Sequence, residues 1–425
     1  MKLSSLFGHV TEVHDEIVRS GRPADRVMDH FFRARKYLGS KDRRFIAETV
    51  YDMLRHRTLI ESSIARSGLP SSSRFSAVAA VLIARSFPEE QLTRELDLAP
   101  GSVESLQHAV SEQLHGPLAV RSSYPEWMTE AWIRSFGTDE AEAICTVMNT
   151  PPPMTIRVNT LKITREECRD RLFSEGLSSE PTVYSPFGLT LAKRTNLFQV
   201  KAFTEGLFEV QDEGSQILSL VVDPKPRTRV IDGCAGAGGK SLAMAAVMKN
   251  TGEIFALDVH TRRLDEMKQR LKRAGVDSIR SMVIEENVIE KTLEGTGDFV
   301  LVDAPCSGTG TIRRNPGMKW SVTPQTVAEL SVKQASILEL NAKYVRPGGV
   351  LVYATCSLMD EENEQVVQRF LTAHPEFERV DPAVRLARYG LAHLANNGYV
   401  QLLPHRTNTD GFYAAVMARK KTVLV

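Results

Sequence analysis

The chain has 425 residues, more than one hydrophobic core usually holds, so two or three domains are expected. A formal net charge of +1 provides no overall attraction to nucleic acid, so any basic binding surface has to be local. Five cysteines without metal-ligand spacing indicate a reducing compartment and argue against a disulfide framework and a zinc site. No run of residues resembles a signal peptide or a membrane span, and the expected location is the cytoplasm.

Residues 1–147 are predicted to be all-helical, because apolar residues recur at spacings of three and four and no alternating strand pattern interrupts them. Positive charge is concentrated in two stretches of this region, 33–36 and 41–44. One interpretation is a phosphate-binding patch. The other is a solvated helix face whose cations form local ion pairs with Asp42, Glu48 and Asp52. The pattern alone favours neither.

Three prolines at 151–153 end the helical region, because proline can neither continue a helix nor pair within a central strand. A small α/β unit is predicted next, within residues 148–205. Its expected elements are a strand from Met154 to Val158, a helix from Arg165 to Glu175 capped by Thr164, and a short strand near 189–191.

A glycine-rich turn follows the first strand of the remaining region, 206–425. The strand is predicted at 228–231, the turn reads Gly-Cys-Ala-Gly-Ala-Gly-Gly-Lys at 233–240, and a second strand at 253–257 ends in Asp258. Glycines allow close approach of the backbone to a ligand, and the helix after the turn presents unpaired N–H groups. An acid after the second strand is placed to accept hydrogen bonds from a ribose diol. These features together predict a nucleoside-cofactor site.

Two other glycine motifs are excluded at this turn. The dinucleotide pattern fails because Ser241 stands where the third glycine belongs, and the Walker phosphate-binding pattern fails because Cys234 occupies a required glycine position.

Two apolar strands further on each end in a loop that contains a cysteine. The strand at 299–303 leads into Asp303-Ala-Pro-Cys306-Ser-Gly-Thr-Gly, and the strand at 350–354 leads into Thr-Cys356-Ser. Ligands of open parallel sheets bind outside the carboxyl ends of the strands, so both cysteines are predicted to converge on one substrate. The alternative is that each cysteine is a small buried hydrophobic residue.

These motifs, in this order and followed by Glu362-Asn-Glu, resemble the RNA 5-methylcytosine methyltransferases of the bacterial Sun (RsmB-like) and eukaryotic NSUN type. The resemblance implies a multidomain fold with three parts. They are an all-α N-terminal NusB-like RNA-binding domain (1–147), a small α/β RRM-like module (148–205) and a C-terminal Rossmann-like α/β methyltransferase domain (206–425). Residues 37–48 carry the NusB-like match, 157–159 match the opening of the module, and 402–413 resemble the family's closing hairpin.

The resemblance also implies S-adenosyl-L-methionine as the cofactor. The cofactor-binding residues carried over are Cys234, Ala235, Gly236, Ala237, Gly238, Gly239, Lys240, Asp258, Glu286 and Asp303. Glu286 is assigned to the adenine side after a strand expected at 282–284, with Glu285 and Asn287 as alternatives. The turn departs from the family's Cys-Ala-Ala-Pro-Gly-Gly-Lys at Gly236 and Ala237, and the lost proline is expected to loosen it.

The catalytic roles follow from the same resemblance. Cys356 is the attacking thiolate, Cys306 serves product release, and Asp303 lies between cofactor and base and hydrogen-bonds the cytosine. A free thiol has a pKa of about 8.5, so Cys356 needs an activating group, which the sequence does not identify. No metal is expected.

The predicted function is methylation of C5 of a cytosine in RNA, above all 16S ribosomal RNA. The alternatives are the same reaction on transfer RNA and a non-enzymatic RNA-binding assembly factor. DNA methylation is disfavoured by motif order, membrane association is not expected, and the oligomeric state is not indicated. The pairs 313–314 and 319–320 could bind phosphate and stack a base at the pocket mouth, or form a solvated loop with one packing tryptophan.

Overall fold

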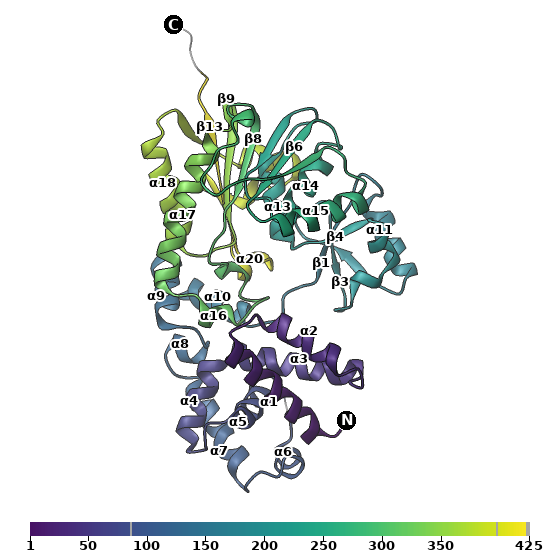
Figure 1. Cartoon of the computed structure of the whole chain (residues 1–425). Coiled ribbons are helices and arrows are strands. Elements are labelled where there is room, and N and C mark those ends of the chain that lie inside the picture. Colours follow the sequence, from purple (N-terminus) through teal and green to yellow (C-terminus); the bar gives the residue numbers. More distant parts are fainter. Residues whose placement is uncertain (86, 397, 422–425) are drawn as a thin grey trace. The chain divides into compact units, whose positions relative to one another are not determined.

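The computed structural model describes residues 1–85, 87–396 and 398–421, which form two compact units (Figure 1). The first, here called the helical unit, contains Met1–Pro151 and Ile312–Val322. The second, here called the mixed unit, contains Pro152–Thr311 and Thr323–Val425. The small α/β module therefore shares a unit with the larger sheet, and a segment from the C-terminal half belongs with the N-terminal helices. The division into three consecutive domains stays a prediction.

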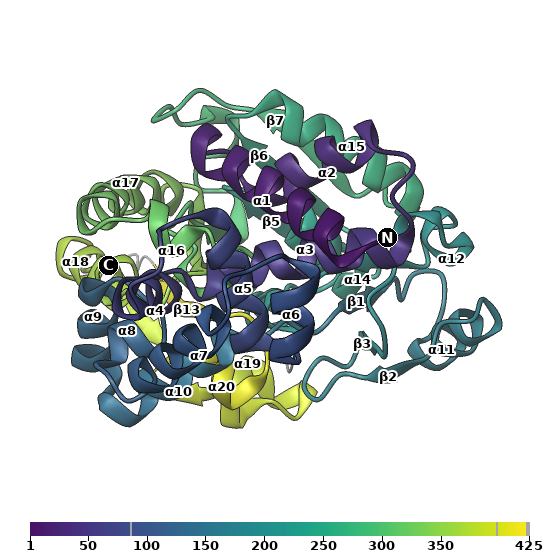
Figure 2. The ribbon, with the colours of Figure 1, turned by 90° about the horizontal axis from the view of Figure 1, so that it is seen from below.

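The regular elements of the helical unit's described residues are all helices, which confirms the helical N-terminal region (Figures 1 and 2). They are α1 (Leu3–Ser20), α2 (Ala24–Ala34), α3 (Ser40–Arg55), α4 (Arg57–Ser67), α5 (Ser73–Ala84), α6 (Glu89–Glu95), α7 (Ser102–Gln113), α8 (Leu118–Arg121), α9 (Glu126–Phe136), α10 (Thr138–Met148) and α16 (Met318–Ser321). The apolar faces of α1 to α7 form one core; from α1, for example, Phe7, Val10 and Val13 contribute to it. Within the described ranges no helix combines the length and apolarity needed to cross a membrane.

One ion pair of the second interpretation lies in the basic stretch 41–44, where exposed Arg44 pairs with Glu48 at 2.8 Å. Asp52 pairs instead with buried Arg55, which lies outside both stretches, at 3.0 Å. Asp42 pairs with the N-terminal amine at 3.5 Å and with neither basic stretch. Exposed pairs contribute only about 0–1 kcal/mol, so these contacts do not prevent exposed cations from meeting a polyanion.

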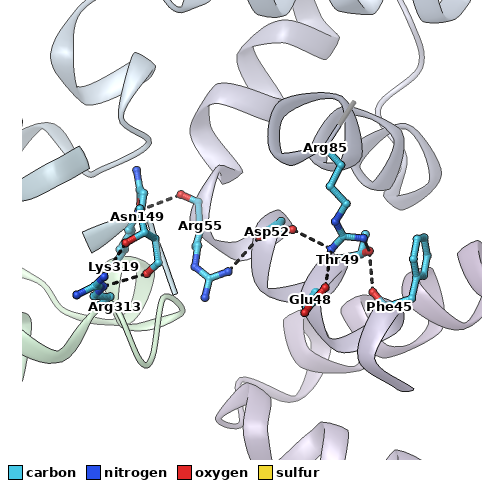
Figure 3. Close-up of polar contacts among 10 residues, drawn as sticks. Phe45, Glu48, Thr49, Asp52, Arg55, Arg85, Asn149, Arg313 and Lys319 are labelled. Carbon is cyan, nitrogen blue, oxygen red and sulfur yellow. Dashed lines mark hydrogen bonds and ion pairs between the residues drawn. The ribbon is translucent and has the colours of Figure 1, made fainter. Parts of the chain in front are cut away.

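The segment 312–322 is anchored inside the helical unit (Figure 3). The Lys319 ammonium is fully buried and donates to the carbonyls of Arg55 and Ser123, at 2.9 and 3.0 Å, and to Oδ1 of Asn149 at 2.5 Å. The indole N–H of Trp320 donates to the carbonyl of Leu54 at 3.0 Å. The phosphate contact considered for Lys319 is therefore wrong, because internal acceptors occupy its ammonium. The contact of Trp320 agrees with the packing tryptophan of the alternative. Base stacking by the half-buried Trp320 ring stays a prediction.

The small sheet of the mixed unit is antiparallel, in the order β2-β3-β1-β4. Its strands are β1 (Thr155–Val158), β2 (Ser179–Pro181), β3 (Gly188–Leu191) and β4 (Phe208–Val210), accompanied by α11 (Arg165–Ser174) and α12 (Lys201–Thr204). Thr164 caps α11 reciprocally: its hydroxyl accepts from the Glu167 N–H, and the Glu167 carboxylate accepts from the Thr164 N–H. The predicted strand, capped helix and strand are thus confirmed. The outer strands β2 and β4 were not predicted, and β4 lies beyond residue 205.

Among the residues that the structure describes, the large sheet has nine strands, in the order β11-β12-β13-β9-β8-β5-β6-β7, with β10 paired to β13. The strands are β5 (Arg229–Asp232), β6 (Glu253–Asp258), β7 (Ile279–Val283), β8 (Gly297–Asp303), β9 (Val345–Thr355), β10 (Phe377–Val380), β11 (Ala395–Asn396), β12 (Tyr399–Leu402) and β13 (Phe412–Arg419). Strands β5 to β9 pair in parallel, and β13 joins β9, β10 and β12 in antiparallel fashion. The pairing of β12 with β13 confirms the closing hairpin.

Alternate residues of β8 enter cores on opposite faces of this sheet. Phe299 and Leu301 pack in one cluster, which α13 (Glu213–Val222), α14 (Gly239–Val247) and α15 (Thr261–Ala274) cover. Val300 and Val302 pack in the other, which is covered by α17 (Pro324–Ala342) and α18 (Glu364–Ala373), side by side in both views (Figures 1 and 2). Two-sided burial explains the continuous apolar run of β8. The fold is the predicted Rossmann-like one, although β7 spans Ile279–Val283 instead of 282–284.

Candidate active site

The candidate site lies where the strand order of the large sheet reverses. β5 continues to β6 and β7 on one side, whereas β8 and β9 pair on the other. The carboxyl ends of β5 and β8 are adjacent, and the Gly233 N–H donates to the Leu301 carbonyl at 2.8 Å. Open α/β sheets bind ligands at such switch points. The loops after β5, β8 and β9 carry the residues that the sequence singled out.

The glycine turn between β5 and α14 is tied by side chains from two other elements. The Asp258 carboxylate at the end of β6 accepts from the Gly236 N–H at 2.8 Å, and Arg270 of α15 donates to the Ala237 carbonyl at 2.8 Å. Gly238 has φ of +82°, and a Cβ there would come within 2.6 Å of Met267 Cγ. Whether the turn is looser without the family's proline stays a prediction. The contribution of Arg270 was not predicted from the sequence.

Lys240, in the first turn of α14, lies opposite Asp303 at the carboxyl end of β8. Its ammonium is 2.5 Å from the Asp303 carboxylate and 5.8 Å from the centroid of the Phe412 ring. Burial acts to lower the pKa of Lys240, but the Asp303 carboxylate and the neighbouring Cys356 act more strongly together, so the pKa is raised. Lys240 is therefore a permanent cation next to Cys356. The sequence indicated this lysine only as a cofactor ligand.

The structure brings the two predicted cysteines together. The sulfur atoms of Cys306 and Cys356 are 3.3 Å apart, each in the loop that follows its strand. The hydrogen bond with Cys356, followed by burial, holds the pKa of the Cys306 thiol well above its ordinary value. Cys306 is therefore protonated near neutral pH. Both cysteines remain partly exposed, which argues against the interpretation of each as a core residue.

The other cysteines differ from this pair. Cys145 and Cys168 are buried, the first in the helical unit and the second in the mixed unit, and desolvation raises the pKa of each thiol to about 12. Cys234 lies in the glycine turn, and burial together with Asp232 and Asp303 raises its pKa. None of these three is placed to act as a thiolate.

Glu286 lies in the exposed loop after β7. Its carboxylate is 2.5 Å from the ammonium of Lys333 on α17, and this contact lowers the pKa of Glu286. Asn287, its neighbour, has a positive φ of 61°. Which residue of this loop meets a cofactor stays a prediction.

Glu362 is a buried carboxylate that connects the two cysteine loops. It belongs to the turn η4 (Asp360–Glu362) and is fully buried. Its partners include the serine that follows each cysteine, Ser307 and Ser357. The sequence showed this glutamate only as part of a family motif, because a contact between positions 55 residues apart leaves no local signal.

No group of three or more histidine, cysteine or acidic side chains in the described part of the chain is arranged to hold a metal ion. The candidate site therefore consists of two adjacent thiols, one lysine–aspartate pair and an adjoining glycine turn. This set offers a nucleophile, a second proton carrier, a fixed cation and a backbone surface for a small ligand.

Comparison with known proteins places these features in a family. Residues 219–418 match the family model of the 16S rRNA methyltransferase RsmB/F, and residues 124–197 match the ferredoxin-like domain of the RsmF/B-like methyltransferases. The probable ribosomal RNA small subunit methyltransferase B of Bacillus subtilis (strain 168) is 36% identical over 304 residues, which cover 71% of this chain and 68% of the relative.

Two solved structures share the fold. The crystal structure of PH0851 aligns with 98% of this chain and 100% of its own, with 27% identity and a TM-score of 0.78. NSun6 from Pyrococcus horikoshii, solved with SFG, covers 71% of this chain and 99% of its own, at 23% identity and a TM-score of 0.62. The second likeness concerns the fold alone. On the evidence of the family models and the relative from Bacillus subtilis, the chain belongs to the Sun/RsmB family of RNA methyltransferases.

Proposed function

We propose that the protein methylates C5 of a cytosine in 16S ribosomal RNA, with S-adenosyl-L-methionine as the methyl donor and Cys356 as the covalent catalyst. The observation that carries the proposal is the 3.3 Å distance between the sulfur atoms of Cys356 and Cys306, together with Lys240, which pairs with Asp303 and interacts with Cys356. RNA methylation itself follows from the family. The position on the base and the covalent route are inferred from the thiols.

Cys356 makes the base reactive. C5 of cytosine is a weak nucleophile, and addition of the Cys356 thiolate to C6 converts the ring into an enamine-like species whose C5 can accept a methyl group. Lys240, whose charge interacts with Cys356, is our candidate for the group that stabilises this thiolate. Asp303 holds the Lys240 ammonium in place and is assigned the hydrogen bond to the cytosine.

Cys306 acts in the second half of the reaction. After methyl transfer, the proton on C5 has to leave and the bond between Cys356 and C6 has to break. The largest cause of the raised pKa of Cys306 is its hydrogen bond with Cys356. Because Cys356 is a neutral thioether in the adduct, that cause disappears and the pKa of Cys306 falls. Cys306 can then release its own proton to water, and the resulting thiolate takes the C5 proton as the bond between Cys356 and C6 breaks.

The glycine turn fits a nucleoside cofactor. The donor supplies an electrophilic methyl group when bound. Open space surrounds the Cα of Gly236, where a Cβ would meet no atom within 4 Å, and the turn leads into the N-terminus of α14. We assign Cys234, Ala235, Gly236, Ala237, Gly238, Gly239 and Lys240, together with Asp258, Glu286 and Asp303, to the cofactor site.

The helical unit is proposed to bind RNA as a NusB-like domain. Lys36, Lys41, Arg33 and Arg44 are exposed on α2, on α3 and between them. Exposed cations supply salt-dependent affinity for phosphates without reading sequence. The small sheet is proposed to support the active site.

Methyl transfer in vitro tests this function. The protein is incubated with labelled S-adenosyl-L-methionine and either 16S ribosomal RNA transcript or total transfer RNA, and the digested nucleosides are separated. We expect label in 5-methylcytidine from the ribosomal transcript and none with Cys356→Ala. Label in transfer RNA alone would support the alternative substrate, and label in another nucleoside would overturn the assignment of C5.

A further inference from the structure

The carboxylate of Glu362 joins the two cysteine loops. Its Oε1 accepts from the Ser307 N–H at 2.8 Å and from the side-chain amide of Gln334 at 2.9 Å. Its Oε2 accepts from the hydroxyls of Ser307 and Ser357, the second at 2.5 Å. Each serine directly follows one of the two cysteines, so this one carboxylate fixes the backbone next to both thiols.

Further hydrogen bonds make the connection rigid. The Thr309 hydroxyl lies 3.2 Å from that of Ser357 and accepts from the Leu358 N–H at 2.9 Å. Gln334, besides contacting Glu362, donates to the Pro305 carbonyl at 2.9 Å. The Tyr353 hydroxyl donates to the Glu362 carbonyl at 2.6 Å. The loop after β8 and the loop after β9 therefore cannot shift apart without breaking buried hydrogen bonds, which are costly to leave unmade.

Glu362 is not placed to touch a substrate. Its side chain is completely buried, and four donors occupy its two oxygens. Its influence on the reaction has to pass through Ser307 and Ser357. The same arrangement explains why a charged group is retained in the interior: a carboxylate accepts from four donors at once, whereas an amide of the same shape offers one accepting oxygen and two donors of its own.

We infer that Glu362 is a positioning residue that fixes the relative position of the Cys306 and Cys356 thiols through the serine after each of them. This inference rests on the proposed function only for the use that the reaction makes of the thiols. The relative position of the two thiols is a property of the folded chain itself.

Two measurements on Glu362→Gln test the inference, with Glu361→Gln as the matched control from the same turn. The first is the steady-state methylation of 16S ribosomal RNA transcript. We expect kcat to fall at least about tenfold, while KM for RNA and for S-adenosyl-L-methionine changes less than about threefold, since neither ligand contacts Glu362. The control should retain both constants.

The second measurement reads the distance between the thiols without any methylation. Diamide oxidises two neighbouring thiols to a disulfide and takes up the two hydrogens, and mass spectrometry of the tryptic peptides identifies a Cys306–Cys356 bridge. We expect the bridge to form at least about tenfold more slowly in Glu362→Gln than in the native protein and in Glu361→Gln. If the protein methylates no RNA, the rate of bridge formation still tests by itself whether Glu362 positions the two thiols.

Serine variants complete the design in case Glu362→Gln does not fold. Ser307→Ala combined with Ser357→Ala removes both hydroxyl links and leaves the carboxylate in place, with Ser336→Ala on the exposed side of α17 as its control. A slower bridge in the double variant supports the inference. A folded Glu362→Gln or double serine variant with native rates of methylation or of bridge formation would overturn it.

Discussion

Asp232 sits beneath the glycine turn as an acid that the interior keeps partly protonated. It is 1% exposed, and its carboxylate accepts from the Ser241 hydroxyl at 2.6 Å. Burial raises its pKa to about 7; the Ser241 hydrogen bond opposes the shift, and the Asp303 charge adds to it. The residue therefore changes charge in the pH range where the enzyme is expected to work.

The pH dependence of stability follows from this shift. In the unfolded chain the pKa of an aspartate is about 3.9, so between pH 4 and 7 the unfolded state has lost a proton that the folded state retains. The proton that the folded state retains on Asp232 therefore stabilises it fully below pH 4, and this stabilisation is lost as the pH rises to 7. The loss is at most about 1.4 kcal/mol for each unit by which the folded and unfolded pKa values differ.

Urea unfolding of Asp232→Asn and of the native protein at several pH values measures this effect. We expect the free energy of unfolding of the variant, relative to the native protein, to increase from pH 4 to pH 7 and to stay constant above it. Parallel curves across that range would show that Asp232 does not titrate as described.

Residues of the catalytic loops show what a sequence can reveal at this scale. Cys306 and Cys356 were predicted to converge because each follows an apolar strand, and parallel strands end at one edge. The roles of Glu362 and Arg270 were not predicted, because each depends on contacts with residues more than 20 positions away. The charge of Lys240 next to Cys356 became evident only from the contact of Lys240 with Asp303 and its interaction with Cys356 in the folded chain.

At the scale of elements, the segment 312–322 shows where sequence patterns mislead. Adjacent basic and aromatic residues just past the Cys306 loop are typical of nucleic-acid contacts. Lys319 instead finds acceptors on residues between 170 and 264 positions away, and no local periodicity encodes such partners. Strands β8 and β9 were predicted because both their faces are apolar, whereas β11 has only two residues and no pattern to detect.

Lys319→Met tests the anchoring of that segment. The substitution keeps the length of the side chain but leaves the carbonyls of Arg55 and Ser123 and the amide oxygen of Asn149 with one donor fewer in a buried place. We expect a loss of about 2–4 kcal/mol in the free energy of unfolding, measured in urea. Lys343→Met, an exposed lysine at the end of α17, should change it by less than about 0.5 kcal/mol. Equal effects of both variants would contradict the anchoring.

At the scale of the whole molecule, positive and negative residues nearly balance. The chain is nearly neutral, so electrostatic affinity for RNA requires local cations, and exposed Lys36 and Lys41 are the ones that we propose. The chain leaves the mixed unit after Thr311 and returns to it at Thr323. The Cys306 loop therefore continues directly into a segment of the helical unit, which composition alone does not indicate.

Salt-dependent RNA binding tests the role of the helical unit. Lys36→Glu combined with Lys41→Glu is expected to weaken binding to 16S ribosomal RNA transcript. The slope of log affinity against log salt should become shallower by roughly 1–2, because each phosphate that a lysine neutralises accounts for about 0.7–0.9 of that slope. Lys249→Glu and Lys343→Glu, both exposed in the mixed unit, form the matched control. An unchanged slope would exclude α2 and α3 from the RNA-binding surface.

The covalent adduct of Cys306→Ala with RNA is the most direct test of the catalytic assignment. The variant is incubated with 16S ribosomal RNA transcript and S-adenosyl-L-methionine, separated on a denaturing gel and digested for mass spectrometry. We predict that a protein–RNA adduct accumulates and that its bond is at Cys356. The double variant that carries both Cys306→Ala and Cys356→Ala should form no adduct. An adduct at any other residue, or none from an active Cys306→Ala variant, would contradict the roles assigned to the two thiols.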